Sequence, residues 1–158
     1  MDARFSVRMP DSWTPIFDLS DKDKVERTLL AAEPQINALI RRILCRDRGD
    51  FMRAKVPMFA VRLYYPHYGQ ARRTARFAAT GACIGCGLCA KNCPVSAIEL
   101  RAGRPVWTKK QCVMCLSCLH RCPKFAIQYG GKTAKHGQYV HPPYEGDPSF
   151  PARGLSRK

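Results

Sequence analysis

The chain has 158 residues and a formal net charge of +15, from 27 Lys and Arg residues against 12 Asp and Glu residues. This length suffices for one domain with extensions, and the longest apolar runs, such as residues 57–61, are far too short to span a bilayer. No apolar segment of a secretion signal follows the first residues. Nine cysteines in such a chain indicate a reducing compartment, so we expect a cytoplasmic protein.

The positive charge is concentrated after residue 50. Residues 1–50 carry nine basic and nine acidic side chains, whereas residues 51–158 carry eighteen basic side chains and three acidic ones. An imbalance of this size favours an acidic partner, with anionic lipid or nucleic acid as the alternatives.

Residues 1–19 are expected to form a strand and a loop. Phe5 and Val7 alternate with polar residues, and Pro10 and Pro15 then interrupt the pattern. This segment contains no Ser/Thr/Gly-rich phosphate loop after its first strand.

A helix is expected next, starting at a capping box formed by Ser20 and Asp23. Apolar residues step by four and three from residue 25 to residue 43, which predicts an amphipathic packing helix. Pro34 lies in this stripe and predicts a kink or a break into two helices. Cys45 lies outside any cysteine pattern, so we expect a buried or half-buried structural thiol.

Residues 51–80 interleave aromatic side chains with arginines. Such a pattern can bind single-stranded nucleic acid. No RNA or DNA motif accompanies it, however, so a segment that docks a partner is the favoured interpretation. Pro57 and Pro66 are expected to bound a short helix.

Two cysteine runs with identical spacing follow, 29 residues apart: CIGCGLCAKNCP at residues 83–94 and CVMCLSCLHRCP at residues 112–123. Three cysteines at every third position let a curled loop place three thiolates on three iron corners of a cubane. The backbone N–H groups of the loop can then reach the sulfurs. Zinc sites lack a proline-terminated triplet, and disulfides need an oxidising compartment, so iron–sulfur clusters are the favoured interpretation.

The proline after each fourth cysteine has no N–H and a fixed φ, so it turns the chain away from the loop. The fourth cysteine is therefore expected to bind the cluster of the other run. We assign two [4Fe–4S] clusters, the first held by Cys83, Cys86, Cys89 and Cys122, the second by Cys112, Cys115, Cys118 and Cys93.

The rest of this region predicts short matching elements. Residues 94–100 and 123–129 are expected to be helices or turns, and residues 101–104 to be the turn of a hairpin. Four apolar residues at matching positions are expected to pack around the cubanes and exclude water: Ile84, Ile98, Val113 and Ile127.

The two runs differ in ways that affect the clusters. Gly85 and Gly87 permit positive φ and close approach in the first loop, whereas Met114 and Leu116 stand there in the second. We expect the second cluster to be drier, so that the two potentials differ. His120 is expected to be exposed and without effect; the alternative is that its imidazolium stabilises the added electron.

Residues 82–129 resemble the bacterial-type ferredoxins that hold two [4Fe–4S] clusters. Residues 6–11 and 131–142 also resemble the EFR-type fusion ferredoxins, in which a flavodoxin-like domain precedes the ferredoxin. This resemblance implies the C-terminal part of such a fusion, or the product of an internal start. Because the phosphate loop is missing, FMN binding is not expected within this chain.

We therefore expect an α+β fold: a ferredoxin module with a pseudo-twofold repeat, short helices and a hairpin, preceded by a helical extension. Four segments are expected: an N-terminal strand and helix at residues 1–48 as a remnant of a flavodoxin-like domain, a basic and aromatic docking linker at 49–81, the two-cluster domain at 82–130, and a basic extended tail at 131–158.

The expected function is one-electron transfer at low potential, as a ferredoxin or as the ferredoxin module of a flavin–iron–sulfur protein. The alternatives are an electron-wiring subunit of a larger oxidoreductase complex, or a basic cluster protein that binds nucleic acid. The expected partner is an acidic redox protein, such as a flavodoxin-like domain or a flavoprotein, and peripheral membrane contact stays open. No catalytic constellation is visible, so we expect a carrier rather than an enzyme, of unspecified oligomeric state.

Overall fold

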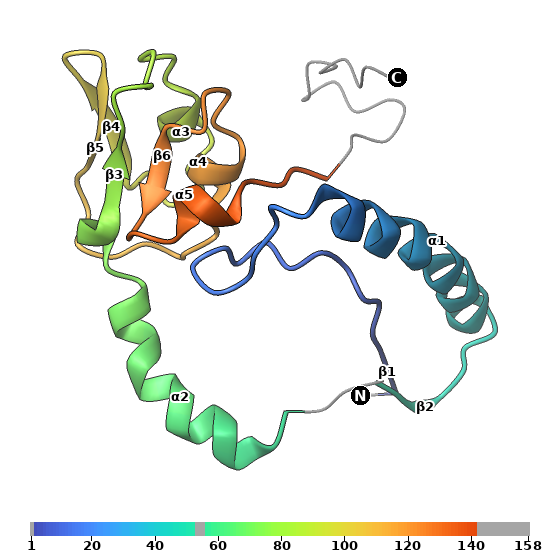
Figure 1. Ribbon diagram of the computed structural model, residues 1–158. Coiled ribbons are helices and arrows are strands. Elements are labelled where there is room, and N and C mark those ends of the chain that lie inside the picture. Colours follow the sequence, from blue (N-terminus) through green and yellow to red (C-terminus); the bar gives the residue numbers. More distant parts are fainter. Residues whose placement is uncertain (1, 53–55, 142–158) are drawn as a thin grey trace, which may run out of the picture.

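The computed structural model describes residues 2–52 and 56–141. Its strands form three separate two-stranded sheets, β1–β2, β3–β6 and β4–β5, in a small α+β architecture (Figure 1). In chain order the elements are β1 (Ala3–Phe5), α1 (Lys22–Leu44), β2 (Gly49–Phe51), α2 (Met58–Ala71), the 3₁₀ turn η1 (Thr74–Arg76), β3 (Phe77–Ala79), α3 (Leu88–Lys91), β4 (Ile98–Arg101), β5 (Arg104–Trp107), α4 (Ser117–His120), β6 (Ile127–Tyr129) and α5 (Thr133–His136).

The N-terminal strand pairs in parallel with β2, at the far end of α1. Phe5 stacks on Phe51 with 5.1 Å between ring centroids, and the guanidinium of Arg42 lies 4.5 Å from the Phe51 ring centroid. An ion pair joins Arg4 to Asp50. The expected strand near residue 5 is therefore present, and its partner is a strand that the sequence pattern did not reveal.

A kink or a break into two helices was expected at Pro34, and the break is wrong, because α1 is one continuous helix. Proline removes the N–H that would bond to the Leu30 carbonyl, and the side chain of Leu30 is exposed, so water can solvate that carbonyl. The helix also starts one residue later than the expected capping box. Asp21 is the N-cap, and its carboxylate accepts a hydrogen bond of 2.9 Å from the Lys24 N–H.

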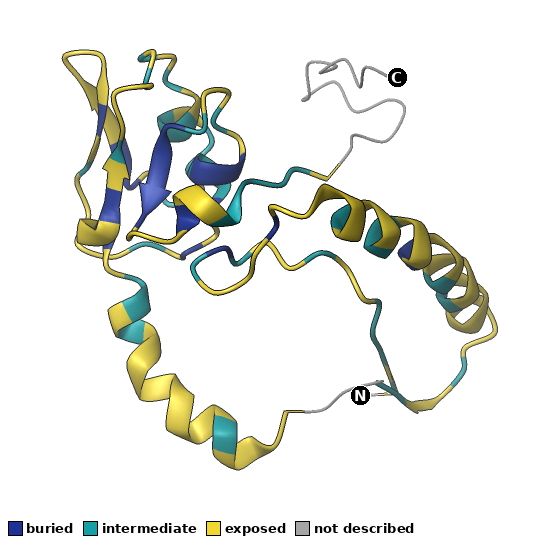
Figure 2. Cartoon of the chain, viewed as in Figure 1, coloured by how far each residue is buried: buried dark blue, intermediate teal, exposed yellow. Residues whose placement is uncertain are grey.

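Most of α1 lies outside the core. Ala32 is buried, but much of the helix surface faces solvent in Figure 2. Cys45 is the C-cap residue of α1 and is exposed, so the expected buried thiol is wrong. A cap position at the end of a surface helix has no neighbouring element to cover it.

The main core lies in the C-terminal half, between β3, β6 and the second cysteine run. Phe77 stacks on Trp107 at 5.4 Å between centroids and meets Tyr129 edge-on at 4.9 Å. These rings and the apolar residues of the second run form one cluster: Phe77, Met114, Leu116, Leu119, Ile127 and Tyr129. The second cysteine run is thus part of the core of this half of the chain.

The hairpin expected at residues 101–104 is confirmed as β4–β5. Its two turn residues, Ala102 and Gly103, have φ values of 49° and 73°, as a type I′ turn requires. The segments at 94–100 and 123–129 are turns that continue into β4 and β6. The helix α5 lies inside the segment that was expected to be extended, and residues 142–158 of that segment lie outside the described residues.

His120 is buried, so the expectation of an exposed side chain is wrong. Its Nε2 donates a hydrogen bond of 2.6 Å to the Ser12 carbonyl, and its Nδ1 accepts one of 3.1 Å from the Tyr139 N–H. Gln138 adds three hydrogen bonds to backbone carbonyls at the end of α4. The imidazole is therefore a neutral link between two distant chain segments, and burial lowers its pKa.

We predict that His120→Phe loosens both segments. The Ser12 carbonyl keeps the Thr14 N–H as a partner at 2.9 Å, but the Tyr139 N–H loses its bond to Nδ1, and each lost hydrogen bond costs about 0.5–1.5 kcal/mol. Amide hydrogen exchange at Tyr139 is expected to accelerate, whereas the exposed control His67→Phe leaves it unchanged. If the Tyr139 amide exchanged at the same rate in both variants, His120 would not be the residue that holds the two segments together.

Because His120 is buried, we predict that the free energy of unfolding depends on pH. Its pKa in the folded protein is below the ordinary value of 6.5, so the unfolded chain binds a proton that the folded chain excludes. The contribution of His120 to the stability of the fold is complete above pH about 6.5. It is lost as the pH falls toward the lower pKa of the folded protein. His120→Phe is expected to flatten that part of the profile.

Candidate metal centre

Each cysteine run curls into a loop through two residues with positive φ. These are Gly85 and Gly87 in the first loop, at 67° and 75°, and Met114 and Leu116 in the second, both at 54°. L-residues rarely adopt this conformation, so its presence at matching places shows that both loops follow one path. The second loop accepts the conformation with large side chains, because Met114 and Leu116 are buried in the core.

Each loop faces a cavity that one cysteine of the other run completes. The volume of each cavity is about 20 Å³. The cysteines around the first cavity are Cys83, Cys86, Cys89 and Cys122, and those around the second are Cys93, Cys112, Cys115 and Cys118. The structure thus brings together the same two sets of four that the cysteine spacing grouped.

The donor set around each cavity, four cysteine sulfurs, fits an iron–sulfur cluster. All nine cysteines are free thiols. Within residues 2–52 and 56–141, no three His, Cys, Asp or Glu side chains converge closely enough to hold one metal ion. Four thiols surround an open space instead, and sulfur ligation by four cysteines is the ordinary mode of iron–sulfur clusters.

Backbone N–H groups reach the sulfurs in a repeated pattern. Ala97 donates to the Sγ of Cys93, and Ala126 to the Sγ of Cys122, both at 3.2 Å. These hydrogen bonds form where the chain turns after each fourth cysteine. They stabilise negative charge on sulfur, and hydrogen bonds of this type help to set the reduction potential of a cluster.

Burial shifts the titration of three thiols. Burial, with a smaller contribution from the neighbouring Cys115, raises the pKa of Cys118 to about 12. Burial likewise raises the pKa values of Cys89 and Cys112. These thiols hold their protons in the metal-free chain, so cluster assembly must release them and should proceed more readily as the pH rises.

The expected apolar shield is present in part. Ile98 and Ile127 are buried and line the second and first cavities respectively. Ile84 and Val113 also line the first and second cavities, as expected, although they are 61% and 41% exposed. Each follows the first cysteine of its run, before the curl that turns the loop inward, and therefore lies at the rim.

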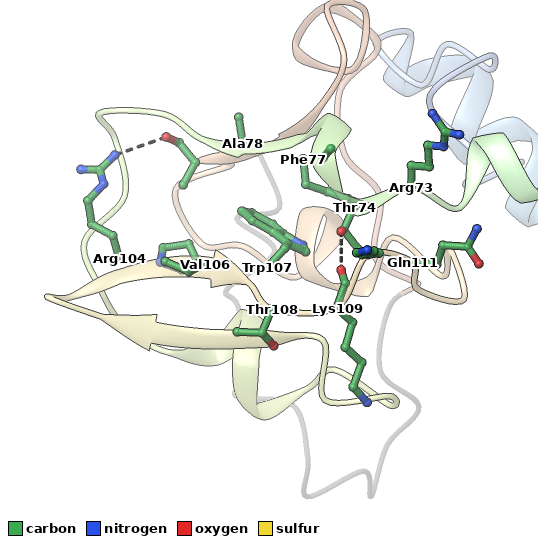
Figure 3. A pocket seen from close by; sticks show the side chains of 14 residues that line it. Arg73, Thr74, Phe77, Ala78, Arg104, Val106, Trp107, Thr108, Lys109 and Gln111 are labelled. Atoms are coloured by element: carbon green, nitrogen blue, oxygen red, sulfur yellow. Dashed lines mark hydrogen bonds between the residues drawn. The ribbon is translucent and has the colours of Figure 1, made fainter.

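A third hollow lies between β3 and β5 and has no cysteine in its lining (Figure 3). The Thr74 hydroxyl closes one end by donating to the Lys109 carbonyl. At the other end, Arg104 donates to the carbonyls of Ala79 and Thr80 at 3.2 and 3.0 Å. These contacts hold η1 and β3 against β5 and the residues that follow it.

Comparison with known proteins agrees with this geometry. Residues 69–127 match the family model of the 4Fe-4S dicluster domain, a stretch that contains both cysteine runs and both cavities. No curated protein matches the chain significantly. The chain therefore contains a 4Fe-4S ferredoxin-like domain, which binds iron–sulfur and serves electron transfer. Among the described residues, no helix is long and apolar enough to cross a membrane.

Proposed function

We propose that the protein transfers single electrons at low potential through two [4Fe–4S] clusters in a pseudo-twofold module. The observation that carries the proposal is the lining of the two cavities, each by three cysteines of one run and the fourth cysteine of the other. When bound, each cluster takes up and releases one electron without changing its ligands. The protein then has to hold the thiolates, exclude water and dock partners.

The residues around the cavities suit these tasks. Ile98 and Ile127 cover the two sites with apolar surface, which lowers the local dielectric. The amides of Ala97 and Ala126 donate to one ligand sulfur in each set. Because Met114 and Leu116 are buried behind the second loop, we propose that the second cluster is the drier one and that the two potentials differ.

The proposed partner is an acidic redox protein, such as a flavodoxin-like domain or a flavoprotein. Eighteen basic side chains against three acidic ones after residue 50 support this choice. An EFR-type fusion would supply such a domain, and FMN would then bind outside this chain. A subunit that wires electrons through a larger oxidoreductase is the second candidate, and a reducing cytoplasm is the proposed location.

Protein-film voltammetry of the anaerobically purified protein tests this function. We expect two reversible one-electron waves at low potential, with separate midpoints because the two loops differ in burial. The proposal would be contradicted if the protein showed no reversible wave and instead bound nucleic acid in a salt-sensitive manner. That result would support the nucleic-acid alternative.

A further inference from the structure

Helix α2 stands apart from the other elements of the chain (Figures 1 and 2). None of its residues is buried, although Met58, Phe59, Leu63 and Tyr65 are large apolar or aromatic residues. Phe59 and Leu63 are four residues apart on one face and are 75% and 74% exposed. Large apolar side chains on a helix are normally buried against another element, and none of the described elements covers this surface.

The carboxyl end of α2 is fastened to the second cysteine run. The Cys112 N–H donates to the Arg72 carbonyl at 3.0 Å, and Arg72 Nε donates to the Cys112 carbonyl at 2.7 Å. Tyr129 Oη donates to the Ala71 carbonyl at 2.8 Å. The helix therefore projects from the residue that begins the second loop, and whatever covers α2 is held close to the second cavity.

The charge around α2 indicates which kind of partner covers the helix. Residues 52–98 contain no Asp or Glu, and Arg72, Arg73 and Arg76 follow the helix directly. A second copy of the chain would bring together two bodies of net charge +15, which repel each other. A helix that lies in a lipid interface needs one strongly polar face, whereas Arg62 is the one charged residue of α2. A protein groove that is apolar inside and rimmed by carboxylates matches both features.

We propose that α2 is a docking helix that inserts into such a groove on an acidic protein partner and brings this partner to the second cluster. The first part rests on the exposure of α2 and the surrounding charge. The second part rests on the proposed function, because it requires a redox-active cluster at Cys112.

The test uses the intact holoprotein and a purified acidic flavodoxin, reduced to its hydroquinone, as the probe. The rate constant for electron transfer is expected to fall at least about tenfold in Leu63→Ser and in Phe59→Ser, since burial of such anchors dominates docking. Leu44→Ser is the matched control, because Leu44 is 76% exposed at the end of α1. It should react like the wild type. Equal rates in all four proteins would overturn the docking helix.

Two further arms separate the other occupants. If Leu63→Ser abolished binding to phosphatidylserine vesicles while leaving the flavodoxin rate unchanged, a membrane surface would replace the protein groove. If the wild type sedimented as a dimer and Leu63→Ser as a monomer, a second copy would replace it. Monomeric wild type without vesicle binding supports the proposal.

Voltammetry of the same samples distinguishes a failure of the docking helix from a failure of the proposed electron transfer. Normal waves with equal rates would overturn only the docking helix, whereas absent waves in the wild type would overturn the proposed function. Binding of the flavodoxin is expected to alter the EPR signal of the second cluster, which Cys93→Ser identifies. If only the EPR signal of the first cluster changed, the claim that α2 brings the partner to the second cluster would be wrong.

Discussion

Replacement of Cys93 by serine is expected to destroy the second cluster and to spare the first, although Cys93 belongs to the first run. The reason is its place beside Cys112, Cys115 and Cys118 around the second cavity. The three remaining thiols of the first run still share their cavity with Cys122. Serine offers a weaker and shorter ligand for iron, so the iron content is expected to fall from about eight to about four per chain.

Cys122→Ser is the matched control, because it removes the fourth cysteine of the other run. It should spare the second cluster and lose the first. EPR spectra of the two reduced variants are therefore expected to be complementary and to add up to the wild-type spectrum when the clusters do not interact. Loss of the cluster on the Cys83 loop in Cys93→Ser would show that each run holds its own cluster.

Gly85→Ala is expected to abolish the first cluster, whereas Gly87→Ala should retain it. Both glycines have positive φ, which costs an alanine about 1–2 kcal/mol at either position. The two positions differ in the room available for a Cβ atom. A Cβ on Gly85 would lie 2.6 Å from the Gly103 carbonyl oxygen in the hairpin turn, whereas a Cβ on Gly87 would approach Leu100 Cδ2 only to 3.9 Å.

The clash at Gly85 involves backbone on both sides, so either the loop or the β4–β5 turn must move. The second loop shows that positive φ alone is tolerable, since Met114 occupies the matching position at 54°. Iron content and EPR after anaerobic reconstitution measure the outcome. Equal occupancy of the first cluster in both alanine variants would mean that the loop can yield, contrary to this account.

The cysteine grouping could be predicted from the sequence because it depends on local spacing and on a proline at a fixed position. The hairpin turn at Ala102 and Gly103 could be predicted for the same reason. Both features are set by a few neighbouring residues, and the structure shows the same arrangement.

The burial of His120 could not be predicted, because its partners Ser12 and Tyr139 are 108 residues before it and 19 residues after it. Such pairings depend on the path of the whole chain. The continuation of α2 through Pro66 was also missed, and the helix ends at Ala71 instead of being bounded by the proline. The carbonyl that Pro66 leaves without an N–H partner belongs to Arg62, which is exposed to water.

The central claim is that this chain holds two [4Fe–4S] clusters. The most direct measurement is the amount of iron and acid-labile sulfide per chain in protein purified or reconstituted without oxygen. The account predicts about eight irons and about eight sulfides. About four of each after full reconstitution, with five of the nine cysteines still open to alkylation, would contradict it.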